Sequence, residues 1–327
     1  MAYGLDRYGE HMLIGVCGEE FPPVREALAQ VIPGAEVVII PHDRTRALPR
    51  VDVLVPLGGR VDAHLLDATQ PKLVQQFGVG LQGVDVAAAR QRGIPVACIP
   101  AADTGNATAV AEAAVMHLLM LLRRVPQLTA SVRHKVIGQP IGQTLAGKTV
   151  TVLGTGAIGQ ALITRLVAFG VTAVGVGRRT YLQQPPGLRS ILPPERFHPS
   201  SHLNKALARS DALVVAVPLT EETRGLVGEA ELAAMPPGGY LVNVGRGPVV
   251  DYTALLGAFR NGHLAGAGLD VAWEEPIDPG DVLLTHNVIV TPHIGGVTVE
   301  SYAKMAAAFA ANVARLAAGD DLANRMA

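Results

Sequence analysis

Three residues in the last third of the chain carry side chains that could act on a small carboxylic acid: Arg246, Glu275 and His293. A guanidinium can hold a carboxylate and polarise an adjacent carbonyl group, while a protonated imidazole can supply a proton. A carboxylate beside that imidazole would keep it oriented and protonated near neutral pH. These are the residue types that the reduction of a 2-keto acid requires.

Each of the three residues also has an ordinary structural explanation. An isolated histidine is more often a hydrogen-bonded part of the fold than a catalyst, and Glu275 could be a solvated charge on a loop. Arg246 could form an ion pair with Asp251. The catalytic interpretation therefore requires elements that bring the three side chains to the carboxyl edge of a parallel sheet, where ligands bind.

A glycine-rich segment between Val150 and Phe169 predicts a dinucleotide-binding loop. An apolar strand runs into Gly-x-Gly-x-x-Gly and then into a helix, an order that lets a pyrophosphate approach the helix N-terminus. The alternative is a glycine-rich turn in an ordinary α/β domain. The residues expected to bind the cofactor are Gly154, Thr155, Gly156, Ala157, Ile158 and Gly159.

The residues after the next predicted strand indicate which cofactor is bound. NAD-binding domains place an aspartate or glutamate about 20 residues beyond the glycine loop. Here Gly177 stands at that point, followed by Arg178 and Arg179. Two guanidinium groups suit a 2′-phosphate, so the sequence predicts NADP(H), with NAD(H) as the alternative. The competing interpretation is that one or both arginines are solvated surface charges.

The N-terminal part of the chain alternates short apolar segments with helical patterns, which is typical of a parallel sheet. Helices are predicted over Pro23–Val31 and Val84–Arg92. The predicted strands are Met12–Gly18, Glu36–Pro41, Val51–Leu57, Leu73–Phe77 and Ile94–Ile99.

A second alternating series begins at Lys148. The segment Gln183–Pro199 contains several prolines and is interpreted as an irregular surface excursion. The predicted strands of this series are Thr149–Leu153, Thr172–Val176, Ala212–Val217, Tyr240–Val244, Ala267–Val271 and Val288–Thr291.

Two long helices flank the second series. The helix Ala107–Arg124, with Asn106 as its N-cap, is apolar around nearly its whole circumference, so we expect it to be buried between domains or between subunits. The last helix, Val299–Ala318, is expected to return to the first domain.

The fold class predicted from these patterns is α/β with two doubly wound parallel-sheet domains. Residues 1–104 and 298–327 would form a flavodoxin-like substrate domain. Residues 105–297 would form an inserted Rossmann domain that binds the dinucleotide.

Composition excludes several classes of function. The 327 residues carry a formal net charge of −1, so no polyanion-binding surface and no nucleic-acid partner are expected. Cys17 and Cys98 lie far apart in apolar runs, as buried thiols do in a reducing compartment. No signal-peptide pattern, membrane span or metal site is recognised, so we expect a cytoplasmic protein.

Taken together, these motifs resemble the D-isomer-specific 2-hydroxyacid dehydrogenase family, including glyoxylate/hydroxypyruvate reductases and members similar to phosphoglycerate dehydrogenase. The resemblance implies that Arg246 binds the substrate, Glu275 is the partner carboxylate and His293 is the acid/base. The segments that carry it are Gly78–Gly80, Ala109–Glu112, Gly154–Gly159, Val217–Thr220, Asn243–Asp251, Gly268–Pro276 and Thr291–Gly296.

The resemblance implies further site residues and a homodimer. The backbone amides of Val79 and Gly80 would bind the substrate carboxylate, and Asn106 would line the cleft. Asp270 would contact the nicotinamide carboxamide. Val217 and Pro218 would lie along the cofactor.

Departures from the family pattern leave the substrate open. Gln82 and Gly83 stand where many members have Asp-Asn, and Ala101–Asp103 replaces a common Pro-Gly pair. Glyoxylate, hydroxypyruvate and other short 2-keto acids all fit. The alternatives are an NAD-dependent enzyme of the phosphoglycerate type, a phosphite dehydrogenase, or a non-catalytic module that senses dinucleotides. A formate dehydrogenase is disfavoured because that class usually has glutamine at the step of Glu275.

Overall fold

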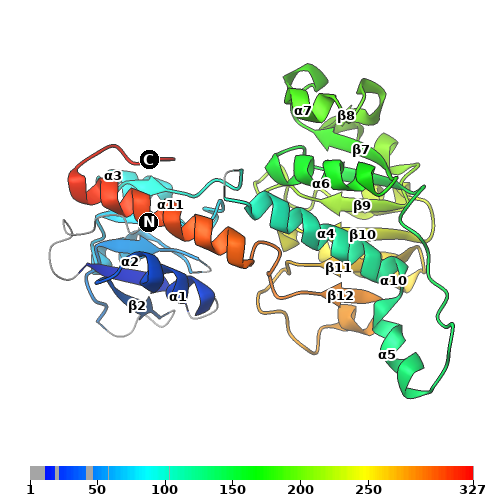
Figure 1. Cartoon of the computed structure of the whole chain (residues 1–327), viewed down its shortest axis with the longest axis horizontal. Coiled ribbons are helices and arrows are strands. Elements are labelled where there is room, and N and C mark those ends of the chain that lie inside the picture. Colours follow the sequence, from blue (N-terminus) through cyan, green and yellow to red (C-terminus); the bar gives the residue numbers. More distant parts are fainter. Residues whose placement is uncertain (1–11, 19–21, 42–46, 58, 103, 327) are drawn as a thin grey trace. The chain divides into compact units, whose positions relative to one another are not determined.

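The computed structural model describes residues 12–18, 22–41, 47–57, 59–102 and 104–326. The chain divides into two compact units, Met1–Gly105 with Val299–Ala327, and Asn106–Thr298. Each unit contains one sheet whose paired strands are all parallel, with helices on both faces (Figure 1). The predicted α/β fold class with two parallel sheets is confirmed.

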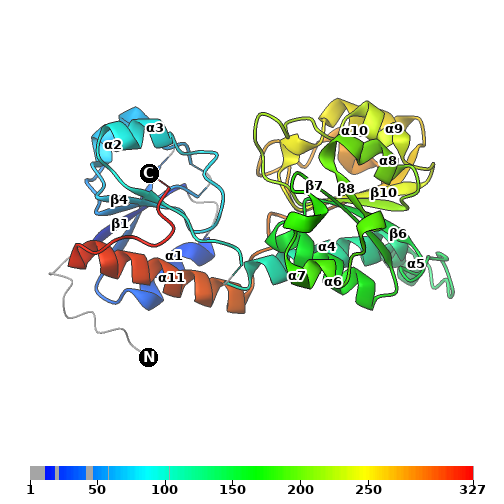
Figure 2. The same cartoon turned by 90° about the horizontal axis from the view of Figure 1, so that it is seen from above.

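The first unit has a five-stranded sheet in the order β2-β1-β3-β4-β5. This is the strand order of flavodoxin-like folds. Helices α1 (Pro22–Val31) and α11 (Val299–Ala318) cover one face, and α2 (Ala63–Thr69) and α3 (Val86–Gln91) cover the other (Figure 2). The strands are β1 (Leu13–Cys17), β2 (Glu36–Ile40), β3 (Val53–Val55), β4 (Leu73–Gln75) and β5 (Val96–Ala97).

A buried asparagine ties the C-terminal helix to this first sheet. Asn312 of α11 donates from Nδ2 to Oε1 of Gln75 in β4 at 2.8 Å, and to the Ala323 carbonyl at 2.9 Å. Its Oδ1 accepts the N–H of Ala323 at 2.8 Å. Buried amides are stable only when paired in this way, so the contact fixes where the chain end returns.

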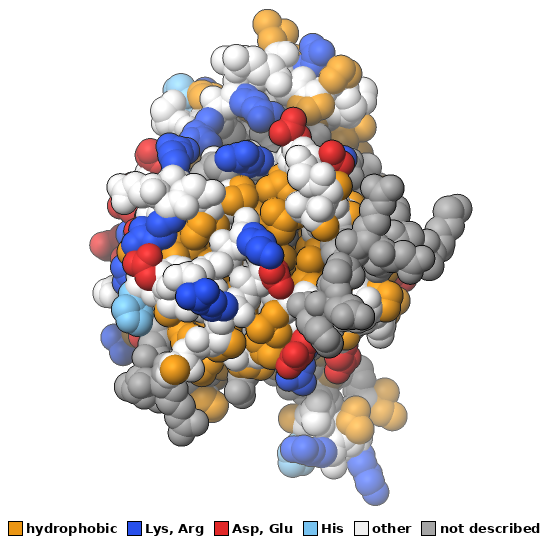
Figure 3. All heavy atoms as spheres, turned by 90° about the vertical axis from the view of Figure 1, so that its left-hand side faces the viewer, with side chains coloured by type: hydrophobic (Ala, Val, Ile, Leu, Met, Phe, Trp, Pro, Cys, Tyr) orange, Lys and Arg blue, Asp and Glu red, His pale blue; other side chains and the backbone are white. Residues whose placement is uncertain are grey.

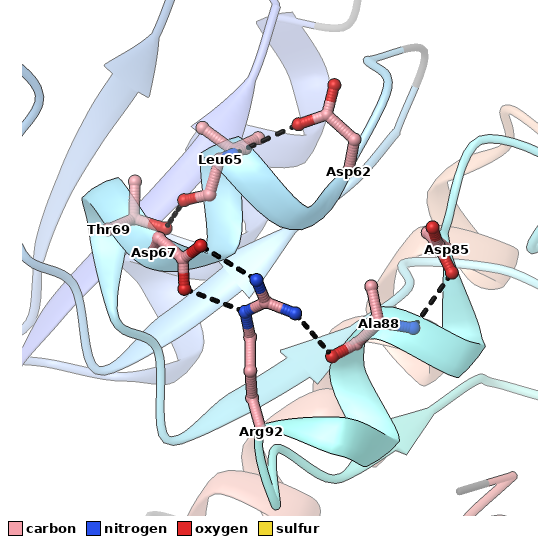
Figure 4. Close-up of polar contacts among 7 residues, drawn as sticks. All are labelled: Asp62, Leu65, Asp67, Thr69, Asp85, Ala88 and Arg92. Carbon is pink, nitrogen blue, oxygen red and sulfur yellow. Dashed lines mark hydrogen bonds and ion pairs between the residues drawn. The ribbon is translucent and has the colours of Figure 1, made fainter.

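Local capping explains why α2 and α3 begin where they do. Asp62 and Asp85 each accept a backbone N–H from the first turn of the following helix, as N-cap residues do (Figure 4). Arg92, directly after α3, donates two parallel hydrogen bonds to Asp67 of α2, each 2.7 Å long. It also donates to the Ala88 carbonyl, so one guanidinium links the two helices.

The second unit has a seven-stranded sheet in the order β12-β11-β10-β9-β6-β7-β8. Counted from β6, this is the Rossmann order with one further strand at the edge. The reversal of direction lies between β6 and β9, where ligands of such sheets bind. The strands are β6 (Thr149–Leu153), β7 (Thr172–Gly177), β8 (Phe197–Pro199), β9 (Ala212–Val215), β10 (Gly239–Asn243), β11 (Leu264–Leu269) and β12 (Val288–Val290).

Helices cover both faces of this second sheet (Figure 2). On one face lie α4 (Asn106–Leu122), α6 (Ala157–Ala168) and α7 (Pro186–Arg189). On the other face lie α8 (Leu203–Leu207), α9 (Glu229–Ala234) and α10 (Tyr252–Arg260).

Helix α4 packs on α6 and on strands β10 and β11, all inside the second unit. That it is also buried between domains or between subunits stays a prediction, but its predicted ends need correction. Asn106 is its first helical residue rather than its N-cap. The helix ends at Leu122, and an unpredicted helix α5 (Val125–Arg133) follows with Pro126 in its first turn.

The prediction of an irregular surface excursion over Gln183–Pro199 is wrong in part. The segment contains α7 and the edge strand β8. Leu188 and Leu192 are only 3% and 1% exposed and belong to the core of the second unit. The prolines break regular structure, but the leucines between them are held by apolar burial.

On the face drawn in Figure 3, basic and acidic side chains lie interspersed among apolar ones. Among the residues described, none of the helices combines the length and apolar character that crossing a bilayer demands.

Candidate active site

Two glycines of the dinucleotide loop are required by close packing. Gly154 has a φ of +106°, and a Cβ there would lie 2.6 Å from the carbonyl oxygen of Ala216, which follows β9. A Cβ at Gly159, in the first turn of α6, would collide with the Gly154 carbonyl oxygen, so a side chain there would force the helix away from the loop that follows β6.

The third glycine of the loop, Gly156, is not crowded by the protein. It is the N-cap of α6, no side chain caps the helix, and a Cβ at Gly156 would meet no protein atom within 4 Å. The first turn of a 12-residue helix, beginning with Ala157 and Ile158, is thus open to an anion. The loop therefore fits the pyrophosphate of a dinucleotide.

Gly177, at the end of β7, has no room for a carboxylate side chain. A Cβ at Gly177 would lie 2.6 Å from Oγ1 of Thr155, and Thr155 is buried. The following residues, Arg178 and Arg179, are exposed. Neither forms an ion pair with another residue in the described part of the chain. Two exposed guanidinium groups therefore follow the position of a ribose-binding acid, and Arg178 lies within electrostatic range of Glu222.

Val217, after β9, lies between the glycine loop and the loop of Arg246. Its Cγ1 would be 2.9 Å from a Cβ at Gly154, and its carbonyl oxygen 2.6 Å from a Cβ at Gly245. Pro218 follows and is exposed. Val217 thus places the dinucleotide loop and the Arg246 turn along one edge of the sheet.

A buried asparagine shapes the turn that presents Arg246. Asn243, the last residue of β10, accepts the Gly245 N–H at 3.0 Å and donates to the Arg246 carbonyl at 2.9 Å. Arg246 itself is half-buried, and its NH1 donates to the Gly245 carbonyl at 2.7 Å. Burial lowers the pKa of Arg246, against the charges of Glu275 and Asp270, which raise it. The guanidinium remains charged and lies within electrostatic range of both carboxylates.

His293 and Glu275 form a hydrogen-bonded pair. Nδ1 of His293 donates to Oε2 of Glu275 at 2.6 Å, and Oε1 of Glu275 accepts the Ala272 N–H at 3.0 Å. Burial alone would raise the pKa of Glu275, but the bond and charge of His293, the Ala272 N–H and Arg246 together hold it below its usual value. Glu275 is therefore a carboxylate at neutral pH and fixes the ring nitrogen that faces it.

Asp270, the buried residue after β11, holds the loop of His293 from both sides. Its Oδ1 accepts the Thr291 hydroxyl at 2.6 Å and the Ile294 N–H at 2.9 Å, and its Oδ2 accepts the Gly295 N–H at 2.8 Å. Its backbone carbonyl accepts the His293 N–H at 3.0 Å. His293 has a φ of +55°, which is costly for a residue with a side chain, and these bonds maintain it.

Asn106 lies beside the same loop. A Cβ at Gly296 would collide with the Asn106 side-chain amide. Asn106 therefore belongs to the surroundings of His293 within the second unit, although its contact with a substrate stays a prediction.

Val79 and Gly80 lie in the first unit, in the loop after β4. The loop is held by hydrogen bonds from Gln76 Nε2 to the Gly80 carbonyl, 2.5 Å, and from the Ile99 N–H to the Gly78 carbonyl, 2.8 Å. Within the described residues, the N–H groups of Val79 and Gly80 donate no hydrogen bond. These two N–H groups are available to donate hydrogen bonds to an anion. Their role toward a substrate carboxylate stays a prediction.

The ordinary explanations of the three candidate residues do not fit this geometry. Asp251 caps α10 by accepting the Ala254 N–H, and it forms no ion pair with Arg246 in the described chain. Glu275 is exposed, but its two carboxylate oxygens are hydrogen-bonded to His293 and to the Ala272 N–H. The sequence analysis assigns no role to Thr291 or to His117, whose Nε2 lies 3.0 Å from the Thr291 hydroxyl. The signal that could have identified His117 is a single histidine inside an otherwise apolar helix.

Comparison of this chain with known proteins identifies the family to which it is similar. Residues 115–295 match the family described as D-isomer specific 2-hydroxyacid dehydrogenase, NAD binding domain. A glyoxylate reductase of Thermococcus gammatolerans is 35% identical over 321 residues, which is 95% of this chain and 88% of that protein. A D-3-phosphoglycerate dehydrogenase of Mycobacterium leprae is 36% identical over 285 residues, 85% of this chain but 52% of that longer protein.

A solved structure is similar over the whole chain. It is the NADPH-dependent glyoxylate/hydroxypyruvate reductase of Sinorhizobium meliloti in complex with NADP and malonate. The two structures superpose with a TM-score of 0.79 and 32% sequence identity, and the match covers 97% of each chain. With the family match over more than half of its length, the chain belongs to the D-isomer specific 2-hydroxyacid dehydrogenase family and is an NAD(P)-binding oxidoreductase.

Proposed function

We propose that this enzyme reduces a short 2-keto acid to the D-2-hydroxy acid with NADPH. The observation that carries the proposal is the 2.6 Å hydrogen bond between His293 Nδ1 and Glu275 Oε2. The pair stands at the sheet edge that also bears the open glycine loop. A proton donor with a fixed orientation next to a dinucleotide loop is what carbonyl reduction needs.

His293 would protonate the carbonyl oxygen of the substrate. Because Nδ1 donates to Glu275, Nε2 is the nitrogen that would give up its proton. The carboxylate of Glu275 holds the ring of His293 in one orientation through Nδ1. When bound, NADPH supplies the hydride that forms the new bond at the keto carbon. The carbonyl thereby gains one hydride on carbon and one proton on oxygen.

Arg246 would bind the substrate carboxylate and its carbonyl oxygen. NH1 donates to Gly245, and the other N–H groups of this guanidinium donate to no other residue in the described ranges. Partial burial strengthens their attraction for an anion relative to a solvated arginine. The same guanidinium would stabilise negative charge that develops on the carbonyl oxygen.

The preference for NADPH would come from Arg178 and Arg179 binding the 2′-phosphate. Their exposure, the lack of ion pairs in the described chain and the absence of space for an acid at Gly177 support this assignment. The similar reductase of Sinorhizobium meliloti is NADPH-dependent and holds NADP. Use of NADH would then be possible but weaker, because the ribose hydroxyl lacks the charge that the arginines bind.

A homodimer is proposed from the segment that follows α4 rather than from α4 itself. Val132 of α5 and the later residues Ile137 and Ile141 are 77%, 97% and 76% exposed. Exposed apolar side chains of this size, close together in sequence, are typical of a surface that another protein covers. Size-exclusion chromatography with light scattering, on the wild type and on an Ile137→Ser/Ile141→Ser variant, tests this point.

The main experiment follows NADPH absorbance with glyoxylate, hydroxypyruvate, pyruvate and phenylpyruvate in turn, and then repeats the series with NADH. The proposal expects consumption of NADPH with at least one acid, a product of D configuration, and a lower kcat/KM with NADH. NADPH binding without turnover of any acid would favour a dinucleotide-sensing module. Reduction of NADP⁺ or NAD⁺ by phosphite would favour a phosphite dehydrogenase instead.

A further inference from the structure

A buried histidine lies behind the loop that carries His293. His117, in the middle of α4, is 0% exposed, and its ring packs so closely on β11 that a Cβ at Gly268 would lie 2.8 Å from its Nδ1. Nδ1 has no hydrogen-bond partner in the described part of the chain. A leucine would fill this apolar position without an unpaired polar atom, so the imidazole is explained by what its other nitrogen does.

The directions of the hydrogen bonds follow from counting protons. Nε2 of His117 is 3.0 Å from Oγ1 of Thr291, and Oγ1 is 2.6 Å from Oδ1 of Asp270. The Thr291 hydroxyl has one proton and donates it to the carboxylate, so it must accept from His117. His117 is therefore the Nε2–H tautomer. Burial lowers its pKa more than the charge of Asp270 raises it, which agrees with a neutral ring.

This relay of hydrogen bonds, from His117 through Thr291, ends at Asp270, whose carboxylate maintains the backbone conformation of His293. Asp270 accepts hydrogen bonds from Thr291 on one side of His293 and from Ile294 and Gly295 on the other. Oδ1 is shared between the Thr291 hydroxyl and the Ile294 N–H. The orientation of the hydroxyl therefore affects how the carboxylate holds the strained residue between them.

We infer that His117 is a positioning residue for the acid/base His293, acting through Thr291 and Asp270. The inference rests on the proposed role of His293. By donating to Oγ1, His117 fixes the Thr291 proton toward Asp270, and the loop of His293 keeps one arrangement. Without the His117 donor, the Thr291 hydroxyl can rotate and the loop of His293 can adopt other conformations. Turnover then falls, while the affinity for the cofactor does not.

The kinetic test compares two replacements of His117. His117→Leu removes the donor and keeps an apolar side chain, whereas the side-chain amide of His117→Gln can donate from the place of Nε2. We expect His117→Leu to lower kcat about five- to tenfold, the size of one lost hydrogen bond, with less than a twofold change in the KM for NADPH. His117→Gln should restore at least half of kcat. A kcat of the leucine variant at the wild-type value, or a glutamine variant as slow as the leucine variant, overturns the inference.

Coupling to Thr291 separates the relay from a local packing defect. Thr291→Val should lower kcat as much as His117→Leu does, and the double variant should be no slower than either single one. Losses that multiply in the double variant would overturn the relay. His64→Leu, on the exposed surface of α2, is the matched control and should leave kcat unchanged.

A spectroscopic readout distinguishes failure of this inference from failure of the proposed function. In ¹⁵N-labelled protein, His117 should show the Nε2–H tautomer, and the His293 ring signals should shift in His117→Leu but not in His64→Leu. If the wild type reduces no 2-keto acid, the proposed function fails, and these signals alone decide whether His117 positions His293. Unchanged His293 signals in His117→Leu, or the Nδ1–H tautomer in the wild type, overturn the inference.

Discussion

The two halves of the carboxyl edge of the second sheet are built in different ways. After β6 and β7, the site consists of a backbone loop and of Arg178 and Arg179, which are exposed. After β10, β11 and β12, functional side chains hold one another: His293 bonds to Glu275, and Asp270 clamps the His293 loop. Under the proposed function, the groups that act on the substrate would be oriented in advance, whereas Arg178 and Arg179 would gain their partner only when the cofactor binds.

The largest effect should come from the pre-oriented half. His293→Ala removes the proton donor, and we expect kcat to fall by about 10²- to 10⁴-fold, the usual contribution of general acid catalysis. The KM for NADPH should stay within about twofold, because the ring does not belong to the glycine loop. Steady-state kinetics with the best 2-keto acid measures both. A variant with wild-type kcat would show that His293 is not the acid.

Arg246→Lys should have the next largest effect. Lysine keeps the charge but cannot offer the planar pair of donors that binds a carboxylate and a carbonyl oxygen together. We expect kcat/KM for the keto acid to fall about 10- to 100-fold, as for one charged hydrogen bond lost in the transition state. Arg260→Lys, in the last turn of α10, is the control at a site without such a role. Equal kinetics for the two variants would contradict the assignment of Arg246.

The cofactor half should respond through affinity and not through chemistry. In Arg178→Ala/Arg179→Ala, the KM for NADPH should rise about tenfold, since charge-assisted bonds to the 2′-phosphate are lost, while kinetics with NADH stay near the wild type. Parallel titrations with the two cofactors measure the ratio. If both cofactors lose affinity equally, the arginines act on the shared part of the dinucleotide, and the predicted specificity is wrong.

How well sequence predicts each half depends on how local its structure is. The glycine loop joins a strand to the helix that follows it, so its residues were predicted from one continuous segment. The contact between His293 and Glu275 requires strands β11 and β12 to lie side by side. Residue types and positions after predicted strands made the pair a hypothesis, and the family resemblance supplied the role of each residue. His117 and Thr291 are 174 positions apart in the sequence but contact each other in the fold. No local sequence pattern indicates such a contact.

Two segments of the fold escaped prediction for physical reasons as well. The prolines of Gln183–Pro199 correctly indicate interrupted structure, but they hide that Leu188 and Leu192, one helical turn apart, face the core. Helix α5 gives a misleading signal in the sequence, because Pro126 is typical of the end of a helix but is also tolerated in the first turn of a new one.

The smallest expected effect concerns the packing of Thr155 against Gly177. It tests whether the cofactor half also contains one rigid contact made by a side chain. A Cβ at Gly177 would lie 2.6 Å from Oγ1 of Thr155, whose side chain is buried. Gly177→Ala should therefore lower the free energy of unfolding by about 1 kcal/mol through overpacking. Urea denaturation measures it.

The double variant Thr155→Ala/Gly177→Ala gives the matched comparison, because alanine at position 155 removes Oγ1, the atom that a Cβ at position 177 would meet. Stability lost in the single Gly177→Ala variant should be recovered in the double variant relative to Thr155→Ala alone, which gives a coupling energy of about 1 kcal/mol. Additive effects would mean that the space at Gly177 is kept open for another reason. The steric explanation for the lack of an acid at this position would then be wrong.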